Sequence, residues 1–199
     1  MARWPILLWA IVLAAAVFAQ NGEAPNCVLL VAKPGLPDPR FRDTVVLVTQ
    51  TADSQTVGVI LNRPTDRKLS DIVADDALAR NYSDAVFFGG PVMDRTLVAL
   101  FRSDSPPAAP AFHVLKGLYL SMHPGAIEPL LKQAGARYRL YAGFSAWAPG
   151  QLDNEMQGDS WYVLPATEEL LFRRDTSGMW QELVERALGK RARSDILDS

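Results

Sequence analysis

The chain has 199 residues, 49% of them hydrophobic, and a formal net charge of −2 at pH 7. This length suits one domain with a sizeable core, and the slightly acidic balance lacks the clustered positive charge of a nucleic-acid-binding protein. The single cysteine, Cys27, excludes an internal disulfide, and its place at the head of an apolar run favours a small buried residue over a reactive thiol.

Residues 1–19 have the pattern of a secretory signal. One cation, Arg3, precedes an apolar run from residue 4 to residue 18, and Val17 and Ala19 occupy the two positions that a signal peptidase recognises. The run of about 15 apolar residues is shorter than the roughly 20 that span a bilayer. We therefore expect cleavage, and an exported protein that is periplasmic or secreted. The alternative is a membrane anchor formed by residues 4–19. Because the signal holds one Arg and no acid, its loss changes the formal charge to −3.

Eight short runs of β-branched and apolar residues, bounded by turn-forming residues, are predicted to be strands. Residues 45–48 (VVLV) are apolar on both faces, so the strand that contains them is expected to be central and covered on both sides. Residues 53–55 are expected to connect it to the next strand as a hairpin. The predicted strands cover residues 27–32, 44–50, 56–61, 85–88, 96–102, 112–120, 138–144 and 161–164.

Two helices are predicted in the middle of the chain. A short helix over residues 69–73 has Ser70 or Asp71 near its N-cap. The helix expected over residues 126–134 contains Pro129, which a helix tolerates only in its first turn.

Two further helices are predicted near the C-terminus. Thr167 is expected to cap a helix over residues 168–173, where two acids face the positive end of the helix dipole. Ser177 is expected to cap the last helix, whose apolar stripe indicates a packing role, and Gly189 to end it. The charged tail, residues 190–199, is predicted to be disordered.

The segment from Ala142 to Glu155 is dense in small residues, yet it carries a Trp, a Gln and two carboxylates. Pro149 removes a backbone donor and Gly150 loosens the backbone, so we predict that the segment is neither a regular helix nor a central strand. Whatever holds such a segment in one shape presents polar groups beside an indole. The segment is therefore the main candidate for a functional site.

Four motifs occur in order along the chain: LVA followed by PGLPDPRF (30–41), GVILNRP (58–64), VFFGGPV (86–92), and AGFSAWAPGQLDNE (142–155) continued by GDSW and PA. In this order and spacing they resemble the YqgE/AlgH family of bacterial proteins, from Cys27 to about Gly189. The resemblance implies an α+β domain, here residues 20–189, with a mixed, barrel-like β-sheet and a few helices packed outside. It attaches no firm enzymatic activity, and the label of transcriptional regulator that some members carry is associational.

The chain also departs from the family pattern. Ala146 and Ala148 stand where the family usually has Gly, which argues against a positive φ at these positions, and Asp153 replaces a Glu, which shortens the carboxylate's reach. Most relatives look cytoplasmic, whereas this chain adds a signal. Nothing in it resembles a helix-turn-helix, and an exported acidic chain is a poor DNA-binding candidate, so no nucleic acid is expected as a partner.

Two of the motifs offer candidate anion-binding groups. Arg63 either binds a ligand carboxylate through two parallel hydrogen bonds or, as we favour, pairs with a carboxylate of its own chain such as Asp153 or Glu155. Gly89 and Gly90 either present backbone N–H groups to an anion or, as we favour, form a tight turn that lets two elements approach closely.

The fourth motif supplies the remaining candidates, Trp147, Gln151, Asp153 and Glu155. Trp147 is either core filler whose N–H is satisfied by a loop carbonyl, which we favour, or one wall of a shallow ligand or peptide site. Asp153 and Glu155, with Asp159, form either an acid–base pair or a solvated loop face. All candidates are expected to meet in space as one surface.

Catalysis is disfavoured. The stretch around Ser145 resembles a nucleophile elbow, but Trp147 stands where that motif needs Gly, and Pro149 interrupts the helix that should follow. Both histidines, His113 and His123, precede the serine and make no metal-binding pattern. A hydrogen bond between Ser145 and either histidine would reverse this judgement.

The sequence thus favours a non-enzymatic binding or accessory domain of the cell envelope, with no cofactor and no metal. Its partner would be an unknown protein or small molecule, and it would meet the membrane only through an uncleaved N-terminal segment. The alternative is a hydrolase-type enzyme of unknown substrate.

Overall fold

The computed structural model describes residues 26–51, 55–72 and 82–197 of the chain. The predicted signal, residues 1–19, lies outside them. None of the helices within these ranges is long and apolar enough to cross a membrane. The described strands are β1 (Cys27–Ala32), β2 (Val45–Gln50), β3 (Thr56–Ile60), β4 (Phe87–Phe88), β5 (Val92–Arg102), β6 (Phe112–Leu115), β7 (Leu118–Ser121), β8 (Tyr138–Trp147) and β9 (Trp161–Leu164).

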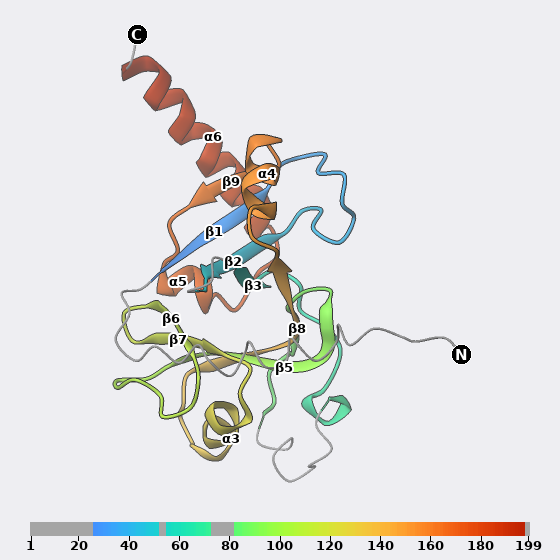
Figure 1. Cartoon of the computed structure of the whole chain (residues 1–199), viewed down its shortest axis with the longest axis vertical. Coiled ribbons are helices and arrows are strands. Elements are labelled where there is room, and N and C mark those ends of the chain that lie inside the picture. Colours follow the sequence, from blue (N-terminus) through green and yellow to red (C-terminus); the bar gives the residue numbers. More distant parts are fainter. Residues whose placement is uncertain (1–25, 52–54, 73–81, 198–199) are drawn as a thin grey trace, which may run out of the picture.

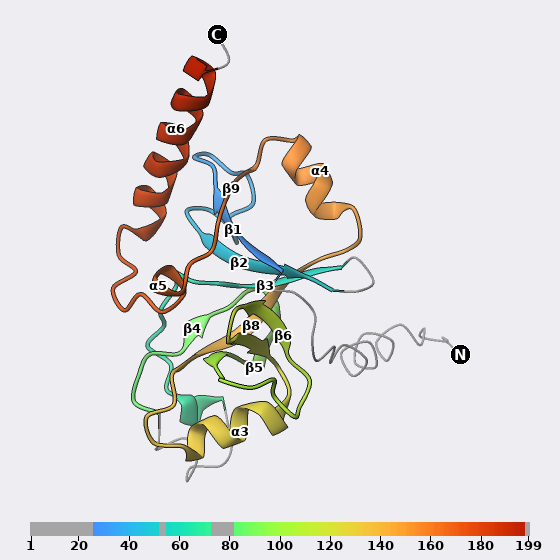
Figure 2. The same ribbon diagram turned by 90° about the vertical axis from the view of Figure 1, so that its left-hand side faces the viewer.

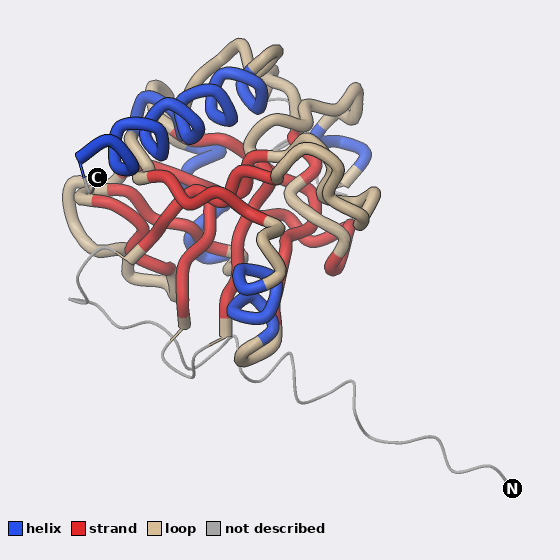
Figure 3. Tube along the Cα trace, turned by 90° about the horizontal axis from the view of Figure 1, so that it is seen from above, coloured by secondary structure: helices blue, strands red, loops and turns tan. Residues whose placement is uncertain are grey.

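These strands form one curled sheet in the order β6-β7-β5-β8-β3-β2-β1-β9, with β4 beside β8 (Figures 1 and 2). Neighbouring strands run antiparallel except β4 and β8, which run parallel. Figure 3 shows the strands in the middle of the molecule and the helices around them. The α+β fold with a mixed, barrel-like sheet and helices outside is therefore confirmed.

Most predicted strands are confirmed, with changes at their ends. The hairpin between β2 and β3 is present, because Gln50 pairs with Thr56, although residues 52–54 lie outside the described ranges. The single strand predicted over residues 112–120 is two strands, β6 and β7, because Gly117 takes a left-handed φ of +70° and turns the chain.

The prediction that residues 142–155 form neither a regular helix nor a central strand is wrong. β8 runs through Trp147 and is the central strand, pairing with β5 along one part and with β3 along the other. Pro149 and Gly150 do not disturb this ladder because they come after the strand ends. Gly150 then adopts a left-handed φ of +76° as the N-cap of a helix that the sequence analysis missed, α4 (Gln151–Gln157).

The other described helices are η1 (Leu69–Asp71), α3 (Pro124–Lys132), α5 (Glu168–Leu171) and α6 (Met179–Leu197). Lys68, rather than Ser70 or Asp71, is the N-cap of η1. In α3, His123 accepts a hydrogen bond from the Gly125 N–H, so the helix begins earlier than predicted and Pro129 falls inside it.

Near the C-terminus, the Thr167 cap of α5 is confirmed, since its hydroxyl accepts from the Leu170 N–H at 3.4 Å. Ser177 does not cap α6, because its hydroxyl donates to Asp175 instead. The predicted helix end at Gly189 is also wrong: α6 continues to Leu197, into the segment predicted to be disordered. A glycine ends a helix only where the chain turns left-handed, and Gly189 has no positive φ.

Three apolar clusters lie between these layers. The central one fills the inside of the curled sheet beneath α5 and α6, and a second packs α3 against β5, β7 and β8. The third lies on the outer face of β1, β2 and β3, under α4 and the loop over residues 33–44. Since both faces are covered, every residue of β2 but the last is buried, as predicted. On α6, Trp180 Nε1 donates to the Ala32 carbonyl at 2.7 Å and fastens the helix to β1.

Candidate functional site

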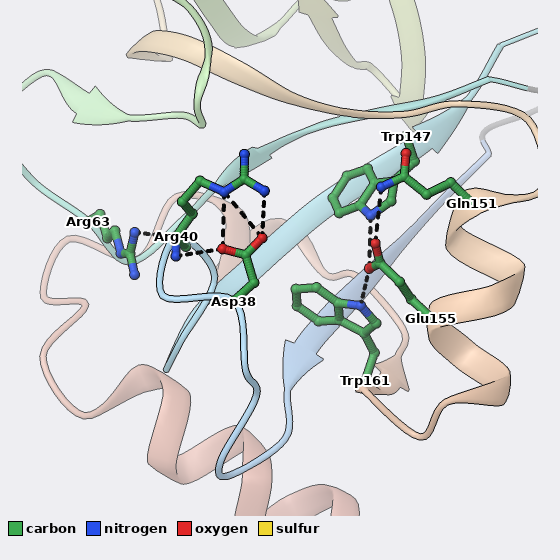
Figure 4. A network of polar contacts seen from close by, with 7 residues as sticks. All are labelled: Asp38, Arg40, Arg63, Trp147, Gln151, Glu155 and Trp161. Atoms are coloured by element: carbon green, nitrogen blue, oxygen red, sulfur yellow. Dashed lines mark hydrogen bonds and ion pairs between the residues drawn. The ribbon is translucent and has the colours of Figure 1, made fainter.

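The end of β8, helix α4 and the start of β9 meet at one carboxylate. Trp147 and Trp161 are buried, with 2% and 3% of their surface exposed. Both indole nitrogens donate to the same oxygen, Glu155 Oε2, at 3.0 and 2.9 Å (Figure 4). Trp147 is therefore core filler, as we favoured, but its N–H is satisfied by a carboxylate instead of a loop carbonyl.

Gln151 completes this arrangement from one turn earlier on α4. Its Nε2 donates to Glu155 Oε1, and its Oε1 accepts from the Ala148 N–H, both at 3.2 Å. No side chain of α4 is fully buried, and Leu152 and Met156 are half-buried against the third core cluster. We call Trp147, Gln151, Glu155 and Trp161 the Glu155 cluster. It connects α4 by hydrogen bonds to the end of β8 and the start of β9.

Arg63 holds the loop between β1 and β2. Its terminal nitrogens donate to the backbone carbonyls of Arg40 and Arg42, at 2.5 and 3.0 Å. Burial lowers the pKa of the guanidinium, and carbonyl dipoles rather than a carboxylate satisfy it. The favoured pairing with Asp153 or Glu155 is therefore wrong, and both terminal nitrogens of Arg63 donate to backbone carbonyls.

The same loop is fastened by the residue before Arg63. Asn62 Nδ2 donates to the Asp43 carbonyl and its Oδ1 accepts from the Val45 N–H, both at 2.9 Å. In return, the loop places Phe41 against the two indoles of the Glu155 cluster, with ring centroids 5.5 and 5.8 Å apart. The Asn-Arg pair after β3 thus shapes the loop that packs on the cluster.

An exposed ion pair lies on this loop, beside the Glu155 cluster (Figure 4). Arg40 Nε and Nη2 bind both oxygens of Asp38 at 2.7 to 3.2 Å. These hydrogen bonds raise the pKa of Arg40 and lower that of Asp38. The pair is the main charged feature of this surface.

Arg63→Lys is expected to loosen the loop nearly as much as Arg63→Ala does, because an ammonium cannot reproduce the two-pronged contact with both carbonyls. Hydrogen bonds from charged donors contribute about 1.5–3 kcal/mol each, so we expect a clear fall in the free energy of unfolding. Hydrogen exchange at the Phe41 and Thr44 amides, which bond within the loop, should accelerate. Arg42→Ala, which keeps its backbone carbonyl, is the control. Equal exchange in all variants would contradict this role.

Gly89 and Gly90 serve close packing. The Gly89 N–H donates to the Ala142 carbonyl at 2.9 Å, so it is not available to an anion. A Cβ at Gly89 would lie 2.2 Å from the Gly143 carbonyl oxygen, and one at Gly90 would lie 2.4 Å from the Phe144 carbonyl. These observations support the tight-turn hypothesis that we favoured.

Ser145 is sealed inside the sheet. It is fully buried, and its hydroxyl donates to the Gly89 carbonyl at 3.2 Å. Within the described ranges it makes no hydrogen bond to a histidine: His113 stacks on Tyr119 near the sheet edge, and His123 caps α3. The condition that would have favoured a serine hydrolase is therefore not met.

Asp153 is exposed on α4 and has no hydrogen bond or ion pair with any described residue. Because it does not reach the Glu155 cluster, its shorter side chain has no consequence there. Ala146 and Ala148 are exposed, and neither has a positive φ. Alanine therefore fits both positions, and the left-handed residue of this turn is Gly150.

Other candidate chemistry is weak in the part of the chain that the structure describes. Burial raises the pKa of the Cys27 thiol to about 11, which disfavours the reactive thiolate. Asp159 pairs with Lys33 rather than with Glu155. No group of three His, Cys, Asp or Glu residues in these ranges could hold a metal ion.

Helix α4 and the contacts by which Asn62 holds the loop between β1 and β2 were not predicted. One signal for α4 was available: Leu152, Glu155 and Met156 follow Gly150 at helical spacing. No comparable signal existed for Asn62, because its partners are 17 and 19 residues away in the chain.

A model of the AlgH-like family matches residues 29–192 of this chain. The chain belongs to this family. The resemblance drawn from the four motifs is thus confirmed. Among similar family members, a UPF0301 protein of Thermobifida fusca is 32% identical over 173 residues, covering 82% of this chain and 87% of its own. A UPF0301 protein of Streptomyces avermitilis is 35% identical over 162 residues, covering 79% and 84%.

Two solved structures share the AlgH-like fold. The solution structure of the AlgH protein from Pseudomonas aeruginosa aligns with a TM-score of 0.66 and 20% identity, over 94% of this chain and 92% of that one. The crystal structure of a protein from Corynebacterium diphtheriae aligns with a TM-score of 0.65 and 24% identity, over 83% and 88%. At these identities the likeness concerns the fold alone.

Proposed function

We propose that this chain is a non-enzymatic binding or accessory domain that is exported to the bacterial cell envelope. The observation that carries the binding role is an open cavity of about 730 Å³ between β4, the start of β8 and the chain after α5. Two smaller depressions of about 550 and 380 Å³ adjoin it and share Tyr82 and Asp84 with it. Ligand sites in proteins commonly have a volume of this order.

The candidate catalytic groups of a hydrolase, Ser145 and Glu155, are engaged in structural contacts. Ser145 is buried within β8, where its hydroxyl donates to the Gly89 carbonyl, and Glu155 accepts hydrogen bonds from two indoles.

The envelope location rests on residues 1–19. We expect the chain, produced in a bacterial host with a C-terminal tag, to be recovered outside the cytoplasm with a mass that lacks these residues. Ala19→Arg places a charge at the expected cleavage position and should leave the full-length chain in the membrane fraction. Ala24→Arg makes the same change beyond that position and should be processed normally. Full-length wild-type chain in the cytoplasm would contradict the proposal.

A further inference from the structure

Building on the proposed binding role, we propose that the 730 Å³ cavity binds a small organic anion through its carboxylate or phosphate group. Three arginines line the cavity, Arg137, Arg139 and Arg174, against one acid, Asp84. In a chain whose formal net charge is −2, this is a local excess of positive charge. Clefts lined by one sign of charge attract ligands of the opposite sign.

Arg139 is the central residue of this argument. Its side chain lies on β8 and the residue is only 7% exposed. The guanidinium donates to the carbonyls of Leu171 and Arg173, at 3.0 and 2.5 Å, and lies 4.5 Å from the centre of the Phe87 ring. No carboxylate in the described ranges forms an ion pair with it. A buried charge without a counter-ion is unfavourable, so an anion in the cavity would supply the missing partner.

The positive charges of the two other arginines, Arg137 and Arg174, are not fully neutralised by described carboxylates. Arg137 donates to Glu168 Oε1 at 2.6 Å, but Arg102 donates to the other oxygen of Glu168 at 2.8 Å, so one negative charge serves two cations. Arg174 is exposed and makes no hydrogen bond or ion pair with any described residue. Both can therefore turn toward an anion that is held at Arg139.

Aromatic groups around these cations favour an organic anion over a bare inorganic one. Tyr82 and Tyr138 line the cavity and stack on each other, with centroids 5.5 Å apart. Phe87, against whose ring the Arg139 guanidinium lies, lines the cavity as well. Burial raises the pKa of Tyr82 and Tyr138, so these phenols stay neutral and do not repel an anion.

Calorimetric titration of the purified full chain with phenyl phosphate and with benzoate, at low ionic strength, tests the proposal and separates phosphate from carboxylate recognition. We expect saturable binding of at least one probe at a single site. Arg174→Glu should weaken this binding at least tenfold. Arg95→Glu makes the same change in net charge on β5, away from the cavity, and should weaken it less than twofold.

Arg139→Lys keeps the charge but loses the two-pronged contact with the carbonyls of Leu171, at the end of α5, and Arg173, so its unfolding must be measured alongside its binding. If Arg139→Lys does not fold, the Arg174→Glu variant still tests the proposal. Equal weakening by Arg174→Glu and Arg95→Glu, or no saturable binding of either probe, would overturn the site.

Export is a separate result. A chain that stays in the cytoplasm but binds a probe through Arg174 would contradict the envelope assignment and keep this site. An exported chain that binds neither probe would contradict this site and leave the export assignment standing.

Discussion

Glu155→Ala should lower the free energy of unfolding by about 3–5 kcal/mol, because two buried indole N–H groups lose their shared acceptor and each unsatisfied buried donor costs about 1–3 kcal/mol. The acceptor is Glu155 Oε2, which binds Trp147 and Trp161 at 3.0 and 2.9 Å. The variant also removes the hydrogen bond from Gln151 Nε2 and so weakens the attachment of α4 to the sheet. Urea unfolding followed by tryptophan fluorescence and far-ultraviolet circular dichroism measures both effects.

Two further variants calibrate this result. Glu155→Gln keeps an oxygen that can accept from the indoles but loses the charge, so we expect an intermediate fall of about 1–2 kcal/mol, the difference between a charged and a neutral hydrogen bond. Asp153→Ala changes an exposed carboxylate on the same helix and should stay within about 0.5 kcal/mol of wild type. If Glu155→Ala matched Asp153→Ala, the Glu155 cluster would not be what attaches α4.

Gly89→Ala is the second large effect that we expect, with a loss of about 3 kcal/mol or more, at the upper end of overpacking changes or beyond. The added Cβ would lie 2.2 Å from the Gly143 carbonyl oxygen and 3.0 Å from the Tyr141 Cβ. Backbone atoms of the central strand cannot move aside without breaking its ladder. We therefore expect most of the protein to be insoluble, or its unfolding midpoint to fall sharply.

Alanine substitutions at two other glycines distinguish the cost of a steric clash from the cost of a left-handed backbone conformation. Gly35 has a φ of +82° but nothing within 4 Å of its Cβ position, so Gly35→Ala should cost only the left-handed penalty of about 1–2 kcal/mol. Gly189 lies in α6 with open space around it, and Gly189→Ala should stabilise the protein by about 0.5–1 kcal/mol. A loss for Gly89→Ala no larger than that for Gly35→Ala would show that β8 yields to the added methyl group.

The Glu155 cluster and the close packing between β8 and the turn after β4 explain why the fourth motif is rich in glycine, tryptophan and polar residues. Gly143 takes a φ of +72°, and a Cβ there would lie 2.5 Å from the Gly90 carbonyl oxygen. β8 and the turn after β4 can therefore approach this closely only because both residues are glycines. Trp147 and Glu155 then attach the helix that follows. The motif is structural at both ends, and the proposed ligand cavity lies elsewhere, around the arginine that precedes it on β8.

Strand positions could be predicted because they depend on local patterns of apolar and turn-forming residues, as in β2, which is buried on both faces. Helix α4 could not be predicted from Pro149 and Gly150, because these residues act only on the turn between β8 and α4 and not on the whole segment. The helix end at Gly189 failed for a related reason: glycine permits a left-handed turn but does not impose one.

From the sequence alone came the family, the kind of fold and the positions of its strands along the chain, since these follow from motif spacing and from hydrophobic periodicity. The tertiary structure alone decided what each polar side chain binds. Arg63 meets carbonyls 21 and 23 residues earlier, and Arg139 meets carbonyls 32 and 34 residues later. Such partners come together only when strands and loops distant in the chain pack side by side. A local sequence pattern cannot predict that packing.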